Sequence, residues 1–380
     1  MKIIADENIP CVKRAFSTLG EVSLLPGRQM RAGDVRDADI LLVRSVTRVG
    51  RELLAGSRLR FVGSATIGFD HIDREYLQEH DIGFATAPGC NATSAAEYVV
   101  SAVLALAERD GFDPADKSVG IIGCGNVGSR VSQKLTALGM RCLVNDPPLK
   151  AQGRHEEFVE LDDIFKADIV TLHVPLTKTG VYPTYHLVDK TFLENLRPGA
   201  ILINTSRGSV VDNRALDAML GERHDLSVVL DVWEKEPAID TALLEKVAIG
   251  TPHIAGYSLD GKLRGTEMIY RAACEFFGNS PQGWNAGDAL PERQAVMLDG
   301  PAHDALKTAV FQSYDVRKDD RRLRNIASLD ADEYPEYFDR LRKEYPVRHE
   351  FSGTTLQVDN TGSPVCRSLQ GLGFDVVATR

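Results

Sequence analysis

The sequence predicts an α/β protein that consists of two doubly wound parallel-sheet domains and a smaller C-terminal α+β domain. Two series of short apolar runs alternate with helical stretches, the first over about ninety residues and the second from Lys117 onwards. Strands that are separated by helices favour right-handed βαβ units and parallel sheets, as in Rossmann and flavodoxin-like domains. After about Pro281 the periodicity changes, and this change indicates the third domain.

The first series contains five short apolar runs that are bounded by turn-forming residues. The expected strands cover residues 2–5, 22–25, 40–43, 61–64 and 82–86. A helix is expected over 10–19, because Gly20 stands where a left-handed residue commonly ends a helix. Asn91 or Thr93 is a candidate N-cap for a long helix that ends near Arg109.

The second series shows the same alternation and leads through five further strands. These expected strands cover residues 119–122, 141–145, 169–173, 200–204 and 227–231. Between the first two of them, residues 126–138 carry apolar side chains at helical spacing, and Gly139 follows as the stop. This part of the chain is therefore also predicted to be an α/β domain.

The last hundred residues differ from both series in charge and periodicity. Nineteen of the 37 residues from Tyr314 to Glu350 are charged, against 26% of the whole chain. Five large side chains fall on one face of a predicted helix in this stretch: Tyr334, Tyr337, Phe338, Leu341 and Tyr345. Such a stripe packs either into the core of its own subunit or against a partner subunit. Two strands are expected at 354–358 and 374–378.

The composition is that of a globular protein with an acidic balance. The 380 residues include 44 Lys and Arg against 54 Asp and Glu, for a net charge of −10, which disfavours nonspecific binding to nucleic acid or anionic membranes. No apolar run reaches the roughly 18–20 residues of a membrane span. Asp6 and Glu7 directly follow the apolar start, so no secretory signal is expected. The six cysteines form no C-x-x-C pair and no zinc spacing, which predicts reduced thiols, no metal site and a cytoplasmic protein.

The strongest local signal is a glycine-rich turn between a predicted strand and a predicted helix. It reads Gly123-Cys124-Gly125-Asn126-Val127-Gly128. The first glycine permits the tight turn, the second lets the backbone approach a pyrophosphate, and the third lets the helix pack on the strand. The helix N-terminus presents N–H groups to the phosphates. Asp146 follows 18 residues later, where it would bind ribose hydroxyls and repel a 2′-phosphate, so NAD is favoured over NADP.

Three polar segments of the second series stand at the ends of apolar runs, where ligands bind in open α/β sheets. They are Asn-Thr-Ser-Arg-Gly at 204–208, Leu-Asp-Val-Trp-Glu-Lys-Glu-Pro at 230–237 and Thr-Pro-His-Ile-Ala-Gly at 251–256. Oxidation of a 2-hydroxy acid needs a base for the hydroxyl proton and a cation for the carboxylate. His253 titrates in the range of a base, Glu236 would orient its imidazole, and Arg207 offers a charged planar fork. Taken singly, each residue also fits an ordinary surface or core role.

In this order, the glycine-rich turn and the three segments resemble the D-isomer-specific 2-hydroxyacid dehydrogenases over roughly residues 1–280. The resemblance implies that Arg207, Glu236 and His253 are catalytic. It also implies a substrate-binding lid domain at 1–92 and 258–280, an NAD-binding Rossmann domain at 93–257, and a cleft that closes between them. The expected cofactor contacts include the glycines of the turn. They are Gly123, Gly125, Asn126, Val127, Gly128, Asp146, Thr205, Ser206, Arg207, Asp231 and Gly256.

One branch of this family oxidises a phosphorylated four-carbon 2-hydroxy acid at C2, and further parts of the chain are similar to that branch. These parts are residues 2–10, 26–28, 43–49 and 65–73 and the C-terminal domain at 281–380. The match implies substrate contacts from Ser45, Thr66 and Tyr257. It also implies a homodimer that forms through residues 281–380.

The sequence offers two candidate ligands for the substrate phosphate. Arg44 and Arg48 flank the Ser45 loop and are the candidates, because arginine binds phosphate in a bidentate manner. The alternative is that one or both are ordinary surface charges. Two other functions stay open: a dehydrogenase for another 2-hydroxy acid such as 3-phosphoglycerate, and an NAD-sensing, corepressor-like binding protein.

Overall fold

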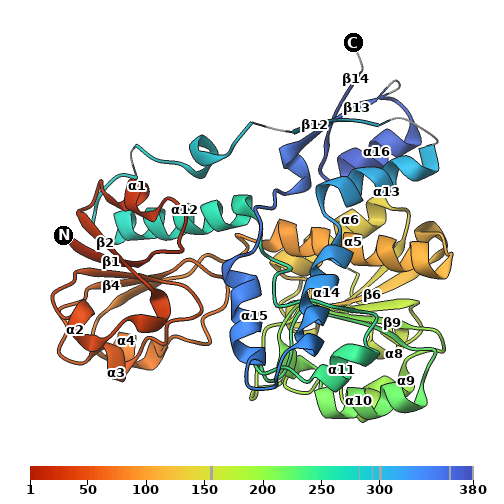
Figure 1. Ribbon diagram of the computed structural model, residues 1–380, viewed down its shortest axis with the longest axis horizontal. Coiled ribbons are helices and arrows are strands. Elements are labelled where there is room, and N and C mark those ends of the chain that lie inside the picture. The colour runs from red at the N-terminus through yellow and green to blue at the C-terminus, as the bar shows by residue number, and fades with distance from the viewer. Residues whose placement is uncertain (155–156, 282, 293, 299–301, 359–360, 379–380) are drawn as a thin grey trace. The chain divides into compact units, whose positions relative to one another are not determined.

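Two units make up the chain, and each combines segments that lie far apart in the sequence (Figure 1). The computed structural model describes residues 1–154, 157–281, 283–292, 294–298, 302–358 and 361–378. The first unit contains Met1–Ala92 and Ser258–Glu292, and the second contains Thr93–Tyr257 and Arg293–Arg380. The chain therefore leaves the first unit after Ala92 and returns to it at Ser258.

The first unit is a parallel sheet with helices on both faces. Its strands lie in the order β2-β1-β3-β4-β5, which is the order of flavodoxin-like folds. They are β1 (Lys2–Asp6), β2 (Glu21–Leu25), β3 (Ile40–Val43), β4 (Phe61–Ser64) and β5 (Gly83–Ala85). The helices are α1 (Val12–Phe16), α2 (Ala32–Val35), α3 (Arg51–Leu54), α4 (Arg74–Glu79) and α12 (Leu259–Phe276).

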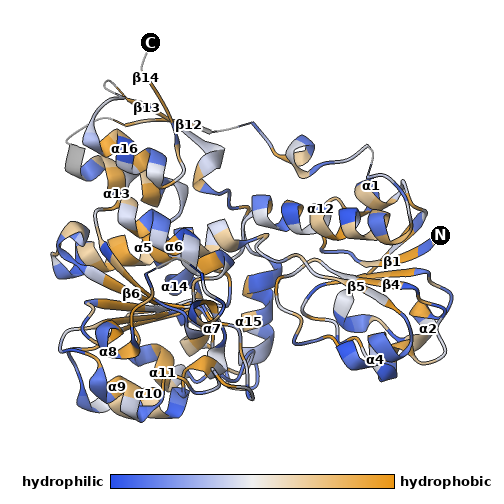
Figure 2. Ribbon diagram, turned by 180° about the vertical axis from the view of Figure 1, so that it is seen from behind, coloured by the Kyte–Doolittle hydropathy of each residue, from blue (hydrophilic) through white to orange (hydrophobic). Residues whose placement is uncertain are grey.

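Alternation along these strands supplies one core to each face of the sheet. Ile40 and Phe61 pack with Ile269 of α12 on one face. Leu41 and Val62, the next residues of the same strands, belong to the core beneath α2, α3 and α4. Figure 2 shows β1 and β4 in orange beside the largely blue α4, as expected for a buried sheet under a solvated helix. The return of the chain at Ser258 thus delivers the helix that covers one face.

The second unit contains a larger parallel sheet in the order β11-β10-β9-β8-β6-β7. Its strands are β6 (Ser118–Ile122), β7 (Arg141–Asn145), β8 (Ile169–Leu172), β9 (Ile201–Asn204), β10 (Ser227–Leu230) and β11 (Ile249–Gly250). The helices before and between them are α5 (Ala92–Asp110), α6 (Asn126–Ala137), α7 (Pro147–Ala151), α8 (Leu161–Ile164), α9 (Lys190–Asn195), α10 (Asn213–Glu222) and α11 (Thr241–Lys246). Because β7 lies on one side of β6 and β8 on the other, the strand order reverses at β6. Ligands of open α/β sheets bind beyond the strand ends at such a point.

The C-terminal part has a small sheet of its own, as the sequence predicts, and its strands are all parallel. The strands are β12 (Gln294–Met297), β13 (Thr354–Val358) and β14 (Asp375–Ala378). The helices are α13 (Ala302–Ser313), α14 (Val316–Arg324), α15 (Tyr334–Lys343) and α16 (Pro364–Gly371). A separate domain is expected from residue 281. This part has its own sheet and also shares a core with the larger sheet.

The shared core is visible in two places. Phe351 and Leu369 belong to the same cluster of buried side chains as Val131 of α6, and α16 packs against both α6 and α13 (Figure 1). A Cβ atom at Gly371 would lie 2.6 Å from the Cβ of Ala137, so the close approach of α16 to α6 requires glycine there. On the other side, α14 packs against β11 at the edge of the sheet.

The aromatic stripe of α15 also packs inside the second unit. Phe338 is fully buried in one cluster with Leu323 and Ile326. The partly buried side chains that pack against this cluster include Tyr334, Tyr337 and Leu341. The sequence leaves two roles open for the stripe. These contacts correspond to packing within the core of its own subunit. Within the residues that the structure describes, no helix is long and apolar enough to cross a membrane.

Candidate active site

The glycine-rich turn leads from β6 into α6. Gly123 has φ of +92°, and a Cβ atom there would lie 2.6 Å from the carbonyl oxygen of His173. A Cβ atom at Gly128 would overlap the carbonyl oxygen of Gly123, so the first turn of α6 needs glycine to reach the strand. Around Gly125, in contrast, a Cβ atom would have no neighbour within 4 Å. The turn therefore packs tightly on the sheet at both ends and is open in the middle.

These features fit a dinucleotide. Gly125 is the N-cap residue of α6 and provides no side chain to cap it, so the N–H groups of the first turn are available to a phosphate. Asp146, at the end of β7, accepts hydrogen bonds from the N–H of Cys124 at 2.7 Å and of Leu149 at 3.0 Å. Its carboxylate thus lies beside the turn, at the place that the sequence predicts for ribose recognition. The neighbouring Asn126 and Val127 are the first residues of α6.

The catalytic candidates Glu236 and His253 are joined by a hydrogen bond. Nδ1 of His253 lies 2.7 Å from Oε2 of Glu236, and the N–H of Trp233 donates to Oε1 of the same carboxylate at 2.8 Å. Burial alone would raise the pKa of Glu236, but His253, the Trp233 N–H and Arg342 together lower it below the usual value. One third of the His253 side chain is exposed (34%). Because Nδ1 faces Glu236, Nε2 is the ring nitrogen that a substrate hydroxyl can meet.

Asp231 holds the backbone that carries His253. Its buried carboxylate accepts hydrogen bonds from Oγ1 of Thr251 and from the N–H groups of Ile254 and Ala255, at 2.7 to 2.9 Å. The N–H of His253 donates to the carbonyl oxygen of Asp231 at 2.7 Å. These bonds hold the backbone of His253 at φ of +56°, a left-handed conformation that residues other than glycine rarely adopt. Sequence resemblance implies that Asp231 contacts the cofactor, and the structure adds this internal role.

Arg207 stands in a loop that is fixed by its neighbours. Oδ1 of Asn204 accepts hydrogen bonds from the N–H and the hydroxyl of Ser206, and Nδ2 of Asn204 donates to the carbonyl oxygen of Arg207 at 3.0 Å. A Cβ atom at Gly208 would overlap the carbonyl oxygen of Trp233, so the loop lies against the segment that carries Glu236. The Arg207 loop therefore lies beside the segment of Trp233 to Glu236, at the carboxyl ends of neighbouring strands β9 and β10.

One residue near this loop is absent from the predicted site. His173 follows β8, where its Nδ1 lies 3.3 Å from Oγ1 of Thr205 and its Nε2 lies 2.9 Å from Oγ1 of Thr171. Burial lowers the pKa of His173 to about 3, so its ring is neutral. In the sequence, His173 is the last residue of the apolar run at 169–173, and a polar residue at the end of such a run is a signal that could have indicated it.

The predicted substrate contacts are divided between the two units. Ser45 and Thr66 lie in the first unit, just after the adjacent parallel strands β3 and β4, and so at one edge of that sheet. Ser45 is exposed, whereas Oγ1 of Thr66 lies 2.8 Å from Oγ of Ser64. Tyr257 lies in the second unit directly after Gly256, and its ring meets that of Tyr345 edge to face at 5.7 Å.

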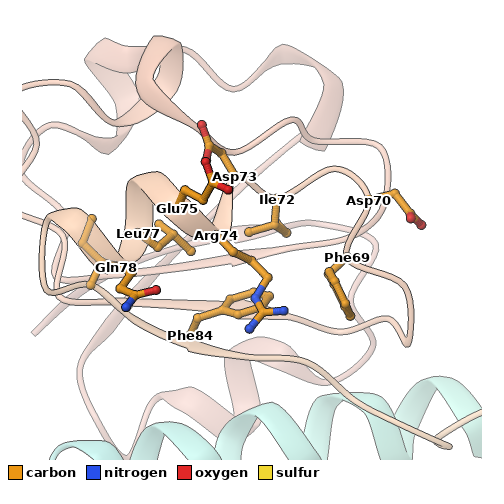
Figure 3. Close-up of a pocket in the computed structure, with 10 residues that line it drawn as sticks. Phe69, Asp70, Ile72, Asp73, Arg74, Glu75, Leu77, Gln78 and Phe84 are labelled. Atoms are coloured by element: carbon orange, nitrogen blue, oxygen red, sulfur yellow. The ribbon is translucent and has the colours of Figure 1, made fainter. Parts of the chain in front are cut away.

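Two other features of the surface lie apart from these residues. A hollow of about 830 Å³ beside α4, shown in Figure 3, is lined by ten residues between Phe69 and Phe84 and by none of the predicted site residues. Among the described residues, one group has the spacing of metal ligands, namely His186, Asp212 and Glu234. Nε2 of His186 lies within hydrogen-bond distance of Oε1 of Glu234, at 2.6 Å.

Two family models match the chain. The first, described as D-isomer specific 2-hydroxyacid dehydrogenase, NAD binding domain, matches residues 89–255. The second, a domain of unknown function (DUF3410), matches residues 290–373. The two matches correspond to the larger sheet and to the C-terminal part of the second unit.

Similar proteins match the chain over almost its whole length. An erythronate-4-phosphate dehydrogenase of Cronobacter sakazakii is 50% identical over 379 residues, which cover 99% of this chain and 98% of that protein. An Escherichia coli protein of the same name is 48% identical over 384 residues and covers 99% of each chain.

Among solved structures, an NAD⁺-bound 3-phosphoglycerate dehydrogenase of Entamoeba histolytica is similar, with a TM-score of 0.64 and 25% identity, covering 73% of this chain and 96% of that one. A D-lactate dehydrogenase of Aquifex aeolicus with NAD and lactic acid has a TM-score of 0.59 and 25% identity, with the same coverage of each chain.

Proposed function

Because the chain belongs to the erythronate-4-phosphate dehydrogenases of the D-isomer-specific 2-hydroxyacid dehydrogenase family, we propose that it oxidises 4-phospho-D-erythronate at C2 with Arg207, Glu236 and His253. The product is 2-oxo-3-hydroxy-4-phosphobutanoate, an intermediate of pyridoxal 5′-phosphate biosynthesis. The observation that carries the residue assignment is the 2.7 Å contact of Glu236 with Nδ1 of His253, in a loop that stands beside the Arg207 loop.

His253 is the base of this reaction. Its neutral ring accepts the C2 hydroxyl proton at Nε2, while Glu236 binds the Nδ1 proton and stabilises the imidazolium that forms. Bound NAD supplies the acceptor for the C2 hydrogen and its electron pair. The lowered pKa of Glu236 keeps this carboxylate charged through the neutral range, so its support of the imidazolium persists until the pH falls below the usual range of glutamate.

Arg207 supplies the positive charge that this reaction needs. Its guanidinium binds the substrate carboxylate and stabilises the negative charge that develops on the C2 oxygen as the hydroxyl proton leaves. The hydrogen bonds of Asn204 hold the backbone on both sides of Arg207, and the guanidinium itself donates from Nη1 to the carbonyl oxygen of Ser206 at 2.8 Å. This arrangement limits the conformations that the side chain must lose when the substrate binds.

The substrate phosphate would be held by the loop after β3. Arg44 is half-buried and Arg48 exposed, and the two flank Ser45 at the carboxyl edge of the first sheet. We expect Arg44→Ala or Arg48→Ala to raise the KM for 4-phosphoerythronate at least about tenfold, as loss of a charge-assisted hydrogen bond does. Arg36→Ala is the control, since Arg36 is an exposed residue at the end of α2. An unchanged KM in both variants would exclude these arginines as phosphate ligands.

The substrate is tested with two phosphorylated acids. We expect reduced nicotinamide to form when the protein and NAD are mixed with 4-phosphoerythronate, and to form far more slowly with 3-phosphoglycerate. The second acid is the relevant comparison because a 3-phosphoglycerate dehydrogenase matches only 73% of the chain, whereas the erythronate-4-phosphate dehydrogenases match 99%. Faster turnover of 3-phosphoglycerate would contradict the proposed substrate. A lack of turnover with any 2-hydroxy acid would favour the NAD-binding protein instead.

The C-terminal part is proposed to form a homodimer in the cytoplasm. All six cysteines are reduced thiols, as in proteins of reducing compartments. Light scattering is expected to give twice the chain mass of 41.7 kDa, and a mass of one chain would contradict the dimer. Deletion of the C-terminal part is unsuitable as a test, because the deletion would uncover the core that Phe351 and Leu369 share with α6. Slower hydrogen exchange in residues 302–358 at high protein concentration than at low concentration is expected if this part forms the contact.

A further inference from the structure

The segment from Arg342 to Arg348 approaches the catalytic loop from the C-terminal part of the same unit. The guanidinium carbon of Arg342, near the end of α15, lies 5.8 Å from the centre of the Tyr257 ring. Tyr345 meets the same ring edge to face. Nη1 of Arg348 donates to the carbonyl oxygen of Ala255 at 3.3 Å. Three residues of a charged stretch thus contact two of the four residues that follow His253, namely Ala255 and Tyr257.

Buried hydrogen bonds and a stacking contact fix the segment from Arg342 to Arg348 in place. Nη2 of Arg348 donates to the carbonyl oxygen of Ser94 in α5 at 2.8 Å, and its guanidinium stacks 3.5 Å from the centre of the Tyr314 ring. The hydroxyl groups of Tyr314 and Tyr345 both donate to Oδ2 of Asp319, at 3.0 and 2.7 Å. These buried polar contacts fix the segment that follows α15. They therefore also restrict the position of Arg342 near the end of that helix.

Arg342 is charged, mostly buried and close to the Tyr257 ring. Its side chain is 15% exposed, and its electrostatic partners are Tyr257, Glu236 and Asp339. Nη1 lies 4.0 Å from the nearest Asp339 oxygen, which is the limit of an ion pair. Arg342 also interacts electrostatically with Glu236 and Tyr257, so its charge is not confined to the carboxylate on its own helix.

We propose that Arg342 is a positioning residue of the catalytic centre, which holds the Tyr257 ring in place and supplies a buried positive charge to the Glu236–His253 pair. The C-terminal part therefore completes the active site of its own chain, in addition to any role in dimerisation. Arginine suits this position because its guanidinium stays charged when buried and stacks on aromatic rings.

The charged groups around Glu236 give the sign of the effect. His253 faces it directly, Asp231 lies behind His253, and Arg342 approaches from α15 with Asp339 beside it. Arg342 is one of the groups that lower the pKa of Glu236. Removal of this positive charge favours the protonated form of Glu236, so its pKa rises. The reaction needs an ionised Glu236, and the acid limb of kcat/KM therefore moves to higher pH.

The test compares Arg342→Gln and Arg342→Lys with a matched control, Arg340→Gln. Arg340 lies on the same helix but is exposed and stacks on Tyr337. In the Arg342→Gln variant we expect a lower kcat and an acid limb that is shifted upwards by about half a pH unit or more. Carbon-13 NMR of the Glu236 carboxyl is expected to show a matching rise in its pKa. Arg342→Lys, which keeps the charge, and Arg340→Gln are expected to titrate like the wild type.

Two results would overturn the proposal. The first is a wild-type Glu236 titration and acid limb in Arg342→Gln, and the second is an equal shift in Arg342→Lys, because the charge would then not be the cause. If Arg342→Gln does not fold, Arg342→Met removes the charge while filling the same space and gives the same test. The kinetic readout rests on the proposed function, but the NMR titration needs no substrate. An inactive wild type would therefore refute the proposed function and leave the role of Arg342 open to measurement.

Discussion

Replacement of His253 by asparagine is expected to lower kcat by about 10²- to 10⁴-fold, the usual contribution of a general base. Asparagine can still bond to Glu236, but it cannot accept a proton at neutral pH. NAD binding should persist, because the turn at 123–128 and Asp146 are separate from the His253 loop. Turnover is measured from the formation of reduced nicotinamide, and NAD affinity by calorimetry.

A matched control for this variant is His224→Asn. His224 is exposed and follows α10, so its replacement should leave both turnover and NAD affinity unchanged. Turnover near the wild-type level in His253→Asn would remove His253 from the role of base. A loss of NAD binding in that variant would mean that the loop, rather than the imidazole, is needed.

Replacement of Arg207 by lysine is expected to lower kcat/KM by about 10²-fold or more. Lysine keeps the charge but loses the planar fork, and an imperfect partner for a buried substrate carboxylate costs roughly 2–5 kcal/mol. Both kcat and KM should change, because the guanidinium binds the carboxylate and also stabilises charge on the C2 oxygen. Initial rates at several substrate concentrations separate the two effects.

Arg214→Lys serves as the comparison for Arg207→Lys, since Arg214 is an exposed residue in the first turn of the nearby α10. Its kinetic constants should match those of the wild type. If Arg207→Lys changed KM alone, Arg207 would bind the substrate without stabilising the transition state. If it changed neither constant, Arg207 would lie outside the site.

The two large sheets could be predicted because their strands are short, apolar and separated by helices. The structure places β3 at Ile40–Val43, β4 at Phe61–Ser64 and β13 at Thr354–Val358, with the same bounds as the predicted runs. Strands that are buried on both faces read as continuous apolar stretches, which makes them visible in the sequence. The strand β11, Ile249–Gly250, has only two residues and is too short to show any periodicity.

The contact between Glu236 and His253 could be predicted from the residue types and from their positions after two strands. Glu236 and His253 are 17 residues apart and follow neighbouring parallel strands, so the fold brings them together. The contribution of Arg342 could not be predicted in this way. It lies 85 residues beyond Tyr257 in a highly charged helix, and such a helix usually faces solvent. Only tertiary packing turns that side chain towards the catalytic loop.

The same reason explains why the core that the C-terminal part shares with the larger sheet could not be predicted. Changes in charge and periodicity indicate a separate domain from residue 281, but they do not report on which core a segment joins. Phe351 and Leu369 pack into the core of the larger sheet, and Phe338 packs into the cluster around Leu323. These contacts join residues that are far apart in the sequence, where no local pattern links them.

The central claim is that this protein transfers the hydrogen on C2 of 4-phospho-D-erythronate to NAD. It is tested most directly with substrate that carries deuterium only at C2, followed by mass spectrometry of the reduced nicotinamide. We predict one deuterium in each reduced cofactor formed, and none when the deuterium is placed at C3. Reduced cofactor without deuterium from the C2-labelled substrate would contradict the claim.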